Sequence, residues 1–88
     1  MKLYHLTQET VTGYDTYSDC VVVAPSREAA QQIHPNFSKS KLADAIKLNH
    51  PWIYFAWPQP DQVTVTYIGE AAAHLIEGAV ICASFHAG

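Results

Sequence analysis

The sequence predicts an α+β fold: a small antiparallel β-sheet of about four strands, in the order β-β-α-(α)-β-β, covered on one face by one or two short helices. Three observations predict it. β-type runs occur towards both ends of the chain, a capped helical segment follows the second run, and a lysine-bearing helical segment precedes the third. The 88 residues suit a single domain, residues 1–88, with a thin core.

The first two strands are predicted from apolar patterning. Residues 3–8 alternate apolar and polar side chains, and residues 12–15 form a turn in which Gly13 is free to adopt a positive φ. Residues 17–24 follow, and the run from Cys20 to Ala24 is apolar without interruption. A run that is apolar on both faces is typical of a covered central strand, so this strand is expected in the middle of the sheet.

A short helix is predicted directly after the second strand. Ser26 is placed to cap a helix over residues 27–33, and Glu28 lies near the positive end of the helix dipole. The helix ends before Pro35, because the residue preceding a proline is pushed out of the α region. A helix of this length is not stable alone, so it must pack on the sheet. Its docking side chains are Ala29, Ala30 and Ile33.

The rest of the chain predicts one more helix and two more strands. A helical segment spans residues 38–48 with Ser40 as its cap, and its apolar residues recur at roughly helical spacing. These residues are Leu42, Ala45, Ile46 and Leu48. The strands lie at residues 63–71 and 80–85, and residues 71–76 are expected to form a helical turn that ends at Gly78.

Charge argues against a nucleic-acid or membrane partner. The net charge is −3, and the chain has neither the basic stripe nor the high pI of a protein that follows phosphates. The N-terminus lacks the apolar stretch of a signal peptide, and no apolar run approaches the ~20 residues that cross a bilayer. The sequence therefore predicts a cytoplasmic chain.

No catalytic or metal-binding motif is evident, so neither enzyme activity nor a cofactor is predicted. The five histidines form no HxxxH or HxH spacing, and there is no CxxC pair. They are His5, His34, His50, His74 and His86. Cys20 and Cys82 lie in apolar runs and are expected to be buried, reduced thiols; a disulfide would require their strands to pair. Asp15 and Asp19 are interpreted as solvated turn residues.

The densest local signal is aromatic. Residues 52–57, between two prolines, carry Trp52, Tyr54, Phe55 and Trp57. Because Trp and Tyr often supply interface hot spots, these residues are predicted to bind a partner protein. The nearby lysines, expected to share that surface, are Lys39, Lys41 and Lys47. Alternatively, Trp52, Phe55 and Trp57 complete the core while Tyr54 faces water.

A second candidate contact patch lies at one edge of the predicted sheet. It consists of Tyr14, Asp15 and Tyr17. The alternative is a surface turn whose tyrosines lie over the sheet.

Several short motifs together resemble a family of small proteins encoded by tailed phages and prophages. The motifs are Gly13–Tyr17, Val22–Ala24, Glu28–Ala30, Ile33–Pro35, Trp57, Tyr67–Ala71 and Val80–Gly88. Residues 36–56 are then a variable insert, and residues 72–76 depart from the family by being less polar, which suggests a specialised loop. The resemblance implies the cytoplasm of an infected bacterium, where small accessory proteins bind and inhibit host proteins, including CRISPR effectors and other defence components.

Two main classes of function are consistent with these observations, and a third ranks below them. The first is a protein-binding module that occludes a host protein. The second is a homo-oligomer that binds a small, nucleotide-type ligand between facing aromatic rings near Lys or Arg. The third is a structural or assembly role. A homodimer is expected in any case, because a small sheet with little charge leaves an edge or an apolar face unpaired.

Overall fold

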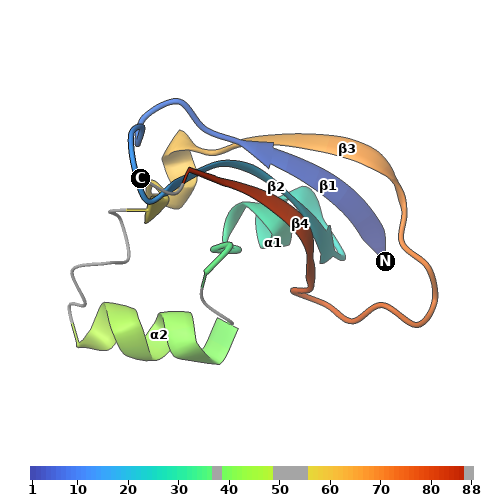
Figure 1. The fold of residues 1–88 in the computed structure, drawn as a ribbon. Helices are drawn as coiled ribbons and strands as arrows, with labels where there is room; N and C mark the ends of the chain where they lie inside the picture. Colours follow the sequence, from blue (N-terminus) through green and yellow to red (C-terminus); the bar gives the residue numbers. More distant parts are fainter. Residues whose placement is uncertain (37–38, 49–55, 87–88) are drawn as a thin grey trace.

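The expected α+β fold is confirmed by the computed structural model, which describes residues 1–36, 39–48 and 56–86. Its elements are β1 (Lys2–Thr7), β2 (Thr16–Ala24), α1 (Arg27–Gln31), α2 (Lys39–Lys47), the 3₁₀ helix η1 (Pro60–Gln62), β3 (Thr64–Glu70) and β4 (Val80–His86). The strands form one antiparallel sheet in the order β3-β1-β2-β4. Helix α1 lies against one face of the sheet, and α2 lies on the same side, beyond α1 (Figure 1).

The β-branched run of β2 occupies an interior position of the sheet, as predicted. Val22 is fully buried, lies opposite Tyr4 of β1, and belongs to the cluster of core side chains beneath α1. Alternate residues of a strand point to opposite faces, so Cys20, Val22 and Ala24 enter this core together. The core residues are Tyr4, Leu6, Cys20, Val22, Ala24, Ala30, Trp57, Val63 and Val65.

The other face of the sheet carries no helix in the described part of the chain. Val21 is only half-buried there, whereas Val23 is fully buried. The loop between β3 and β4 forms two hydrogen bonds with the backbone of Val23. The Val23 N–H donates to the Ala79 carbonyl at 2.9 Å, and the Val23 carbonyl accepts from the Gly78 N–H at 2.8 Å. The expectation of a strand covered on both faces is therefore correct at Val23 and only partly correct at Val21.

Helix α1 begins as its cap predicts. Ser26 has extended backbone angles, and its Oγ accepts a hydrogen bond from the Ala29 N–H at 3.2 Å, which satisfies one of the free donors of the first turn. Ala30 is fully buried, and Ala29 and Ile33 pack against the core. The helix ends at Gln31, slightly earlier than the sequence indicates.

Two local predictions are wrong. Helix α2 begins at Lys39, so Ser40 lies inside it and is not its cap. Residues 71–79 form two tight turns rather than a helical turn. The first is closed by the Leu75 N–H donating to the Ala72 carbonyl, and the second by the Ala79 N–H donating to the Ile76 carbonyl. Gly78, with φ of +85°, provides the left-handed residue of the second turn.

The two cysteines lie on neighbouring strands but on opposite faces of the sheet. Cys20 is opposite Ala83 and is buried in the core, while Cys82 is opposite Val21 and exposed. The prediction of a buried thiol is therefore right for Cys20 and wrong for Cys82, because β4 is an edge strand. Although β2 and β4 pair, the two sulfur atoms point away from each other, so no disulfide joins them. Burial raises the pKa of Cys20 to about 12.

This arrangement predicts a clear difference in thiol reactivity. In the folded protein Cys82 is expected to react with an aromatic disulfide reagent such as DTNB, while Cys20 reacts only after denaturation, because it is buried and its thiolate is disfavoured. The number of reactive thiols per chain is measured from the aromatic thiolate that DTNB releases, before and after guanidinium is added. Cys82→Ser is the control and should remove the fast thiol. Two fast thiols in the native protein would contradict the placement of Cys20.

Candidate functional site

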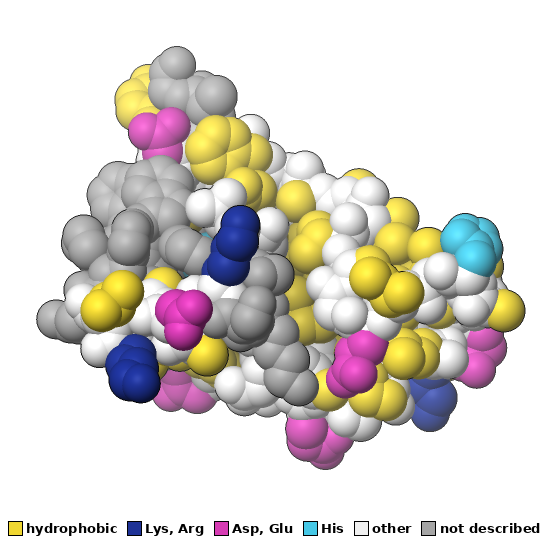
Figure 2. Space-filling view, turned by 90° about the horizontal axis from the view of Figure 1, so that it is seen from below, with side chains coloured by type: hydrophobic (Ala, Val, Ile, Leu, Met, Phe, Trp, Pro, Cys, Tyr) yellow, Lys and Arg dark blue, Asp and Glu magenta, His cyan; other side chains and the backbone are white. Residues whose placement is uncertain are grey.

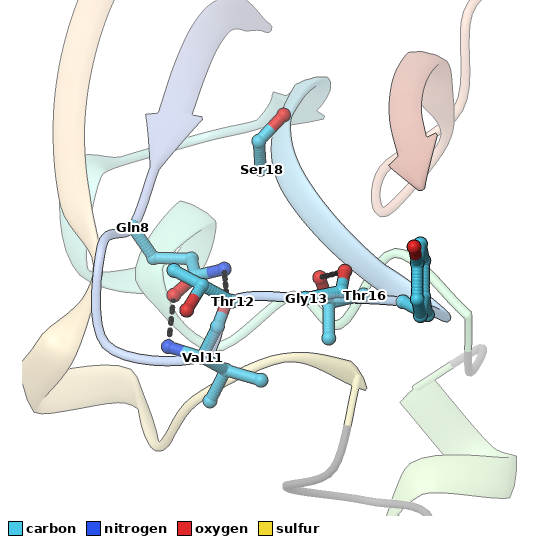
Figure 3. Close-up of a pocket in the computed structure, with 7 residues that line it drawn as sticks. Gln8, Val11, Thr12, Gly13, Thr16 and Ser18 are labelled. Carbon is cyan, nitrogen blue, oxygen red and sulfur yellow. Dashed lines mark hydrogen bonds between the residues drawn. The ribbon is translucent and has the colours of Figure 1, made fainter. Parts of the chain in front are cut away.

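The connection between β1 and β2 is an ordered loop, called here the Tyr14 loop (residues 8–15). Gln8, 7% exposed, organises it with its side-chain amide. Its Nε2 donates to the Val11 carbonyl at 2.6 Å, and its Oε1 accepts from the Val11 N–H at 2.8 Å (Figure 3). The same Nε2 donates to the Tyr17 carbonyl, also at 2.6 Å. One side chain therefore fixes both the start of the loop and its return into β2.

The turn at the tip of the loop is fixed separately. Gly13 has φ of +105°, and Asp15, with φ of +61°, occupies the left-handed region that costs most residues energy. Thr16 Oγ1 donates to the Gly13 carbonyl at 2.8 Å and holds this turn closed (Figure 3). Thr10 Oγ1 donates to Gln62 Oε1 at 2.8 Å and ties the loop to η1. Asp is among the few non-glycine residues that adopt this left-handed conformation readily, so its side chain suits the turn.

Tyr14 stands on this fixed turn and is 75% exposed. Beside it lies a hollow of about 380 Å³. The hollow is lined by Gln8, Val11, Thr12, Gly13, Tyr14, Thr16 and Ser18. This described lining carries no Lys or Arg, the residues that the nucleotide-binding alternative expects near its aromatic rings. The site instead offers one large aromatic side chain on a rigid support.

Within the second predicted patch, the tyrosines differ. Tyr14 and Asp15 are exposed, whereas Tyr17 is half-buried and packs against the core. The ring of Tyr17 lies 4.7 Å from that of Phe85, centroid to centroid, and its hydroxyl contacts Asn36 Oδ1 at 3.4 Å. The alternative interpretation, a tyrosine laid over the sheet, is therefore correct for Tyr17 alone.

The first predicted contact surface is only partly described. Trp57 is 2% exposed and belongs to the core, so its prediction as a partner-binding residue is wrong, and its core alternative is correct. The remaining three aromatics, Trp52, Tyr54 and Phe55, lie outside the described residues. Lys39 begins α2, and Lys41 and Lys47 are exposed on that helix.

Helix α2 also exposes some of the apolar side chains that recur at helical spacing in the sequence. Ile46 is 52% exposed and Leu48, just beyond the helix, is 79% exposed; only Ala45 is buried. Viewed from the α2 side, apolar and Lys or Arg side chains lie close together at the left of the molecule (Figure 2). This surface, defined by Lys41, Ile46, Lys47 and Leu48, is a second exposed candidate contact.

The open face of the sheet carries a His–Asp hydrogen bond that the sequence did not indicate. His5 Nε2 lies 2.8 Å from Asp19 Oδ2. The hydrogen bond from His5, followed by that from Ser84, holds the pKa of the Asp19 carboxyl below its usual value near 3.8. Asp19 is thus a paired strand residue, and its interpretation as a solvated turn residue is wrong. Because the carboxylate lies between imidazole and hydroxyl, His5 does not activate Ser84 as it would in a Ser-His-Asp triad, where the imidazole is central.

Within residues 1–36, 39–48 and 56–86, no three His, Cys, Asp or Glu side chains come together to form a metal site. No helix in those ranges is both long enough and apolar enough to cross a bilayer.

Comparison with known proteins gives no relative: no protein-family model, curated protein or solved structure matches this chain. The candidate site therefore depends on the geometry of the chain itself.

Proposed function

We propose that this chain is a non-enzymatic protein-binding module that inhibits a host protein by covering part of its surface, with the Tyr14 loop as the principal contact. The observation that carries the proposal is the 75% exposure of Tyr14 on a loop that the buried amide of Gln8 holds by three hydrogen bonds.

Preorganisation gives this loop its value in binding. Ordering a flexible segment during association costs free energy, and a loop already fixed in its bound shape avoids most of that cost. Tyrosine offers a large amphipathic surface with few rotatable bonds, and it is among the residues that most often act as binding hot spots. The proposal therefore needs no rearrangement of the described loop.

The surroundings of Tyr14 favour a particular kind of partner surface. Asp15 is exposed beside it, and the chain as a whole carries a net charge of −3. A complementary surface would hold an apolar pocket for the ring with Lys or Arg at its rim, since opposite potentials across an interface favour the correct pairing. The resemblance to phage-encoded proteins supports a host protein as that partner, with a CRISPR effector or another defence component as the target class.

Affinity capture with matched tyrosine variants tests the proposal. The tagged chain, Tyr14→Ala and Tyr67→Ala are each incubated with a bacterial lysate, and bound proteins are identified by mass spectrometry. Tyr67, 49% exposed on β3, is the control because it has the same side chain at a different place. Tyr14→Ala is expected to lose the captured protein, since removing a hot-spot aromatic costs about 2 kcal/mol or more, roughly 30-fold in affinity.

Tyr67→Ala should retain the captured protein, and circular dichroism should show both variants folded. If Tyr14→Ala captures as well as the wild type while Leu48→Ala does not, the contact is the α2 surface and the proposed role of the Tyr14 loop is wrong.

A further inference from the structure

The two edges of the sheet differ in how they are protected. The order β3-β1-β2-β4 leaves β3 and β4 as edge strands. An edge strand presents backbone N–H and C=O groups that another strand can pair with, and proteins usually block such edges. The β3 edge is blocked in this way, and the β4 edge is not.

Side chains of α1 bond to the start of the β3 edge and to the turn before it. Arg27 Nη2 donates to the Val65 carbonyl at 2.7 Å, and Gln31 Nε2 donates to the Pro60 carbonyl at 2.8 Å and approaches the Val63 carbonyl at 3.5 Å. A charged guanidinium on this edge both satisfies a carbonyl and obstructs an incoming strand. The edge ends at Glu70, another charge.

The β4 edge lacks these devices. Residues 80–85 contain no charged residue and no proline, and residues 81–85 are all exposed. Val21 is paired with Cys82, and Asp19 with Ser84. The N–H and C=O of Val23 are bonded towards the β4 side, and alternation along β2 directs those of Val21 and Asp19 the same way.

The backbone groups of Cys82 and Ser84 are consequently used in pairing with β2. By alternation along β4, the backbone N–H and C=O groups of Ala83 and Phe85 point away from β2, towards the outer side of the strand. These two residues therefore form an open hydrogen-bonding edge.

A second copy of the same strand fits this edge. Antiparallel pairing of a strand with itself obeys a two-fold axis, the usual symmetry of homodimers. With the axis at Ala83, Ile81 of each copy lies opposite Phe85 of the other; these side chains are 47% and 44% exposed. Cross-strand pairs of aromatic and β-branched residues stabilise a sheet. Because the strand is uncharged, two chains of net charge −3 can meet here without placing like charges opposite each other.

We propose that the protein forms a two-fold dimer in which β4 pairs antiparallel with β4 of a second copy about Ala83, joining the two sheets into one. The proposed interface uses residues of β4 and none of the Tyr14 loop. Loss of the dimer and loss of the binding partner are thus independent results.

Two variants that place opposite charges at Ala83, the residue on the axis, test this pairing. Sedimentation equilibrium of the full chain is measured for wild type, Ala83→Lys and Ala83→Glu at high micromolar concentration. Ala83 is exposed, so both substitutions leave the core intact. Wild type is expected to dimerise, and each variant to dimerise at least about tenfold more weakly, because two like charges then lie directly opposite each other. An equimolar mixture of the two variants should recover the dimer.

Thr66→Lys, which adds a charge to an exposed position of β3, is the control and should dimerise like the wild type. A monomeric wild type would overturn the proposal, including the case in which the edge binds an extended segment of another protein. Dimerisation that persists in both single variants, or that the mixture does not recover, would also overturn it.

Discussion

Val22→Asp is expected to abolish folding. Val22 is fully buried in β2, in the core beneath α1, and the described core holds no cation that could pair with a carboxylate there. An unpaired buried charge costs several kcal/mol, a large part of the ~5–15 kcal/mol that stabilises a typical domain. Circular dichroism and a one-dimensional proton spectrum should show loss of the sheet and of dispersed methyl signals.

The neighbouring residue gives a matched control. Val21→Asp makes the same chemical change one position away, on the open face, where the side chain is half-buried and lies opposite His5. That variant is expected to fold with a smaller loss of stability, because its carboxylate keeps contact with water. If Val22→Asp folds as well as Val21→Asp, the assignment of the two faces of β2 is wrong.

Trp57→Ala is expected to have the second-largest effect, a loss of about 3–5 kcal/mol in the free energy of unfolding. Trp57 is 2% exposed and is the largest fully buried side chain described, so its removal leaves a cavity in a core that is already thin. Urea denaturation followed by far-ultraviolet circular dichroism measures the change. Tryptophan fluorescence is unsuitable here because the substitution removes one of the two tryptophans.

Leu48→Ala is the control for Trp57→Ala. Leu48 is 79% exposed, and the substitution should change the free energy of unfolding by less than about 0.5 kcal/mol. A Trp57→Ala protein with wild-type stability but without its captured partner would restore Trp57 as a contact residue.

Local chemistry in the sequence predicts most of the fold. The uninterrupted run in β2 indicates an interior strand because apolar side chains on both faces are typical of covered strands. Ser26 indicates the start of α1 because its hydroxyl satisfies a free N–H of the first turn, and the structure contains that bond. Strand order is less accessible, since it depends on contacts between distant segments. The exposure of Cys82 follows from the edge position of β4, which its apolar sequence does not reveal.

The candidate site is less predictable than the fold. Tyr14 and Asp15 are noticeable in the sequence because they follow Gly13 in a turn. Gln8 is not noticeable in the sequence, since a glutamine at the end of a strand usually faces water. It is buried because the loop returns to within hydrogen-bonding distance of its side-chain amide. Trp57 was misjudged because aromatic density alone does not distinguish a core residue from an interface residue.

The most direct test of the account is the affinity of the captured partner for Tyr14→Ala, measured beside the melting temperature of that variant. The account predicts a melting temperature equal to that of the wild type and an affinity lower by at least about 30-fold, because the exposed ring contributes to binding and not to the core. Unchanged affinity, or an affinity that falls only in step with the melting temperature, would contradict the assignment of the Tyr14 loop as the contact.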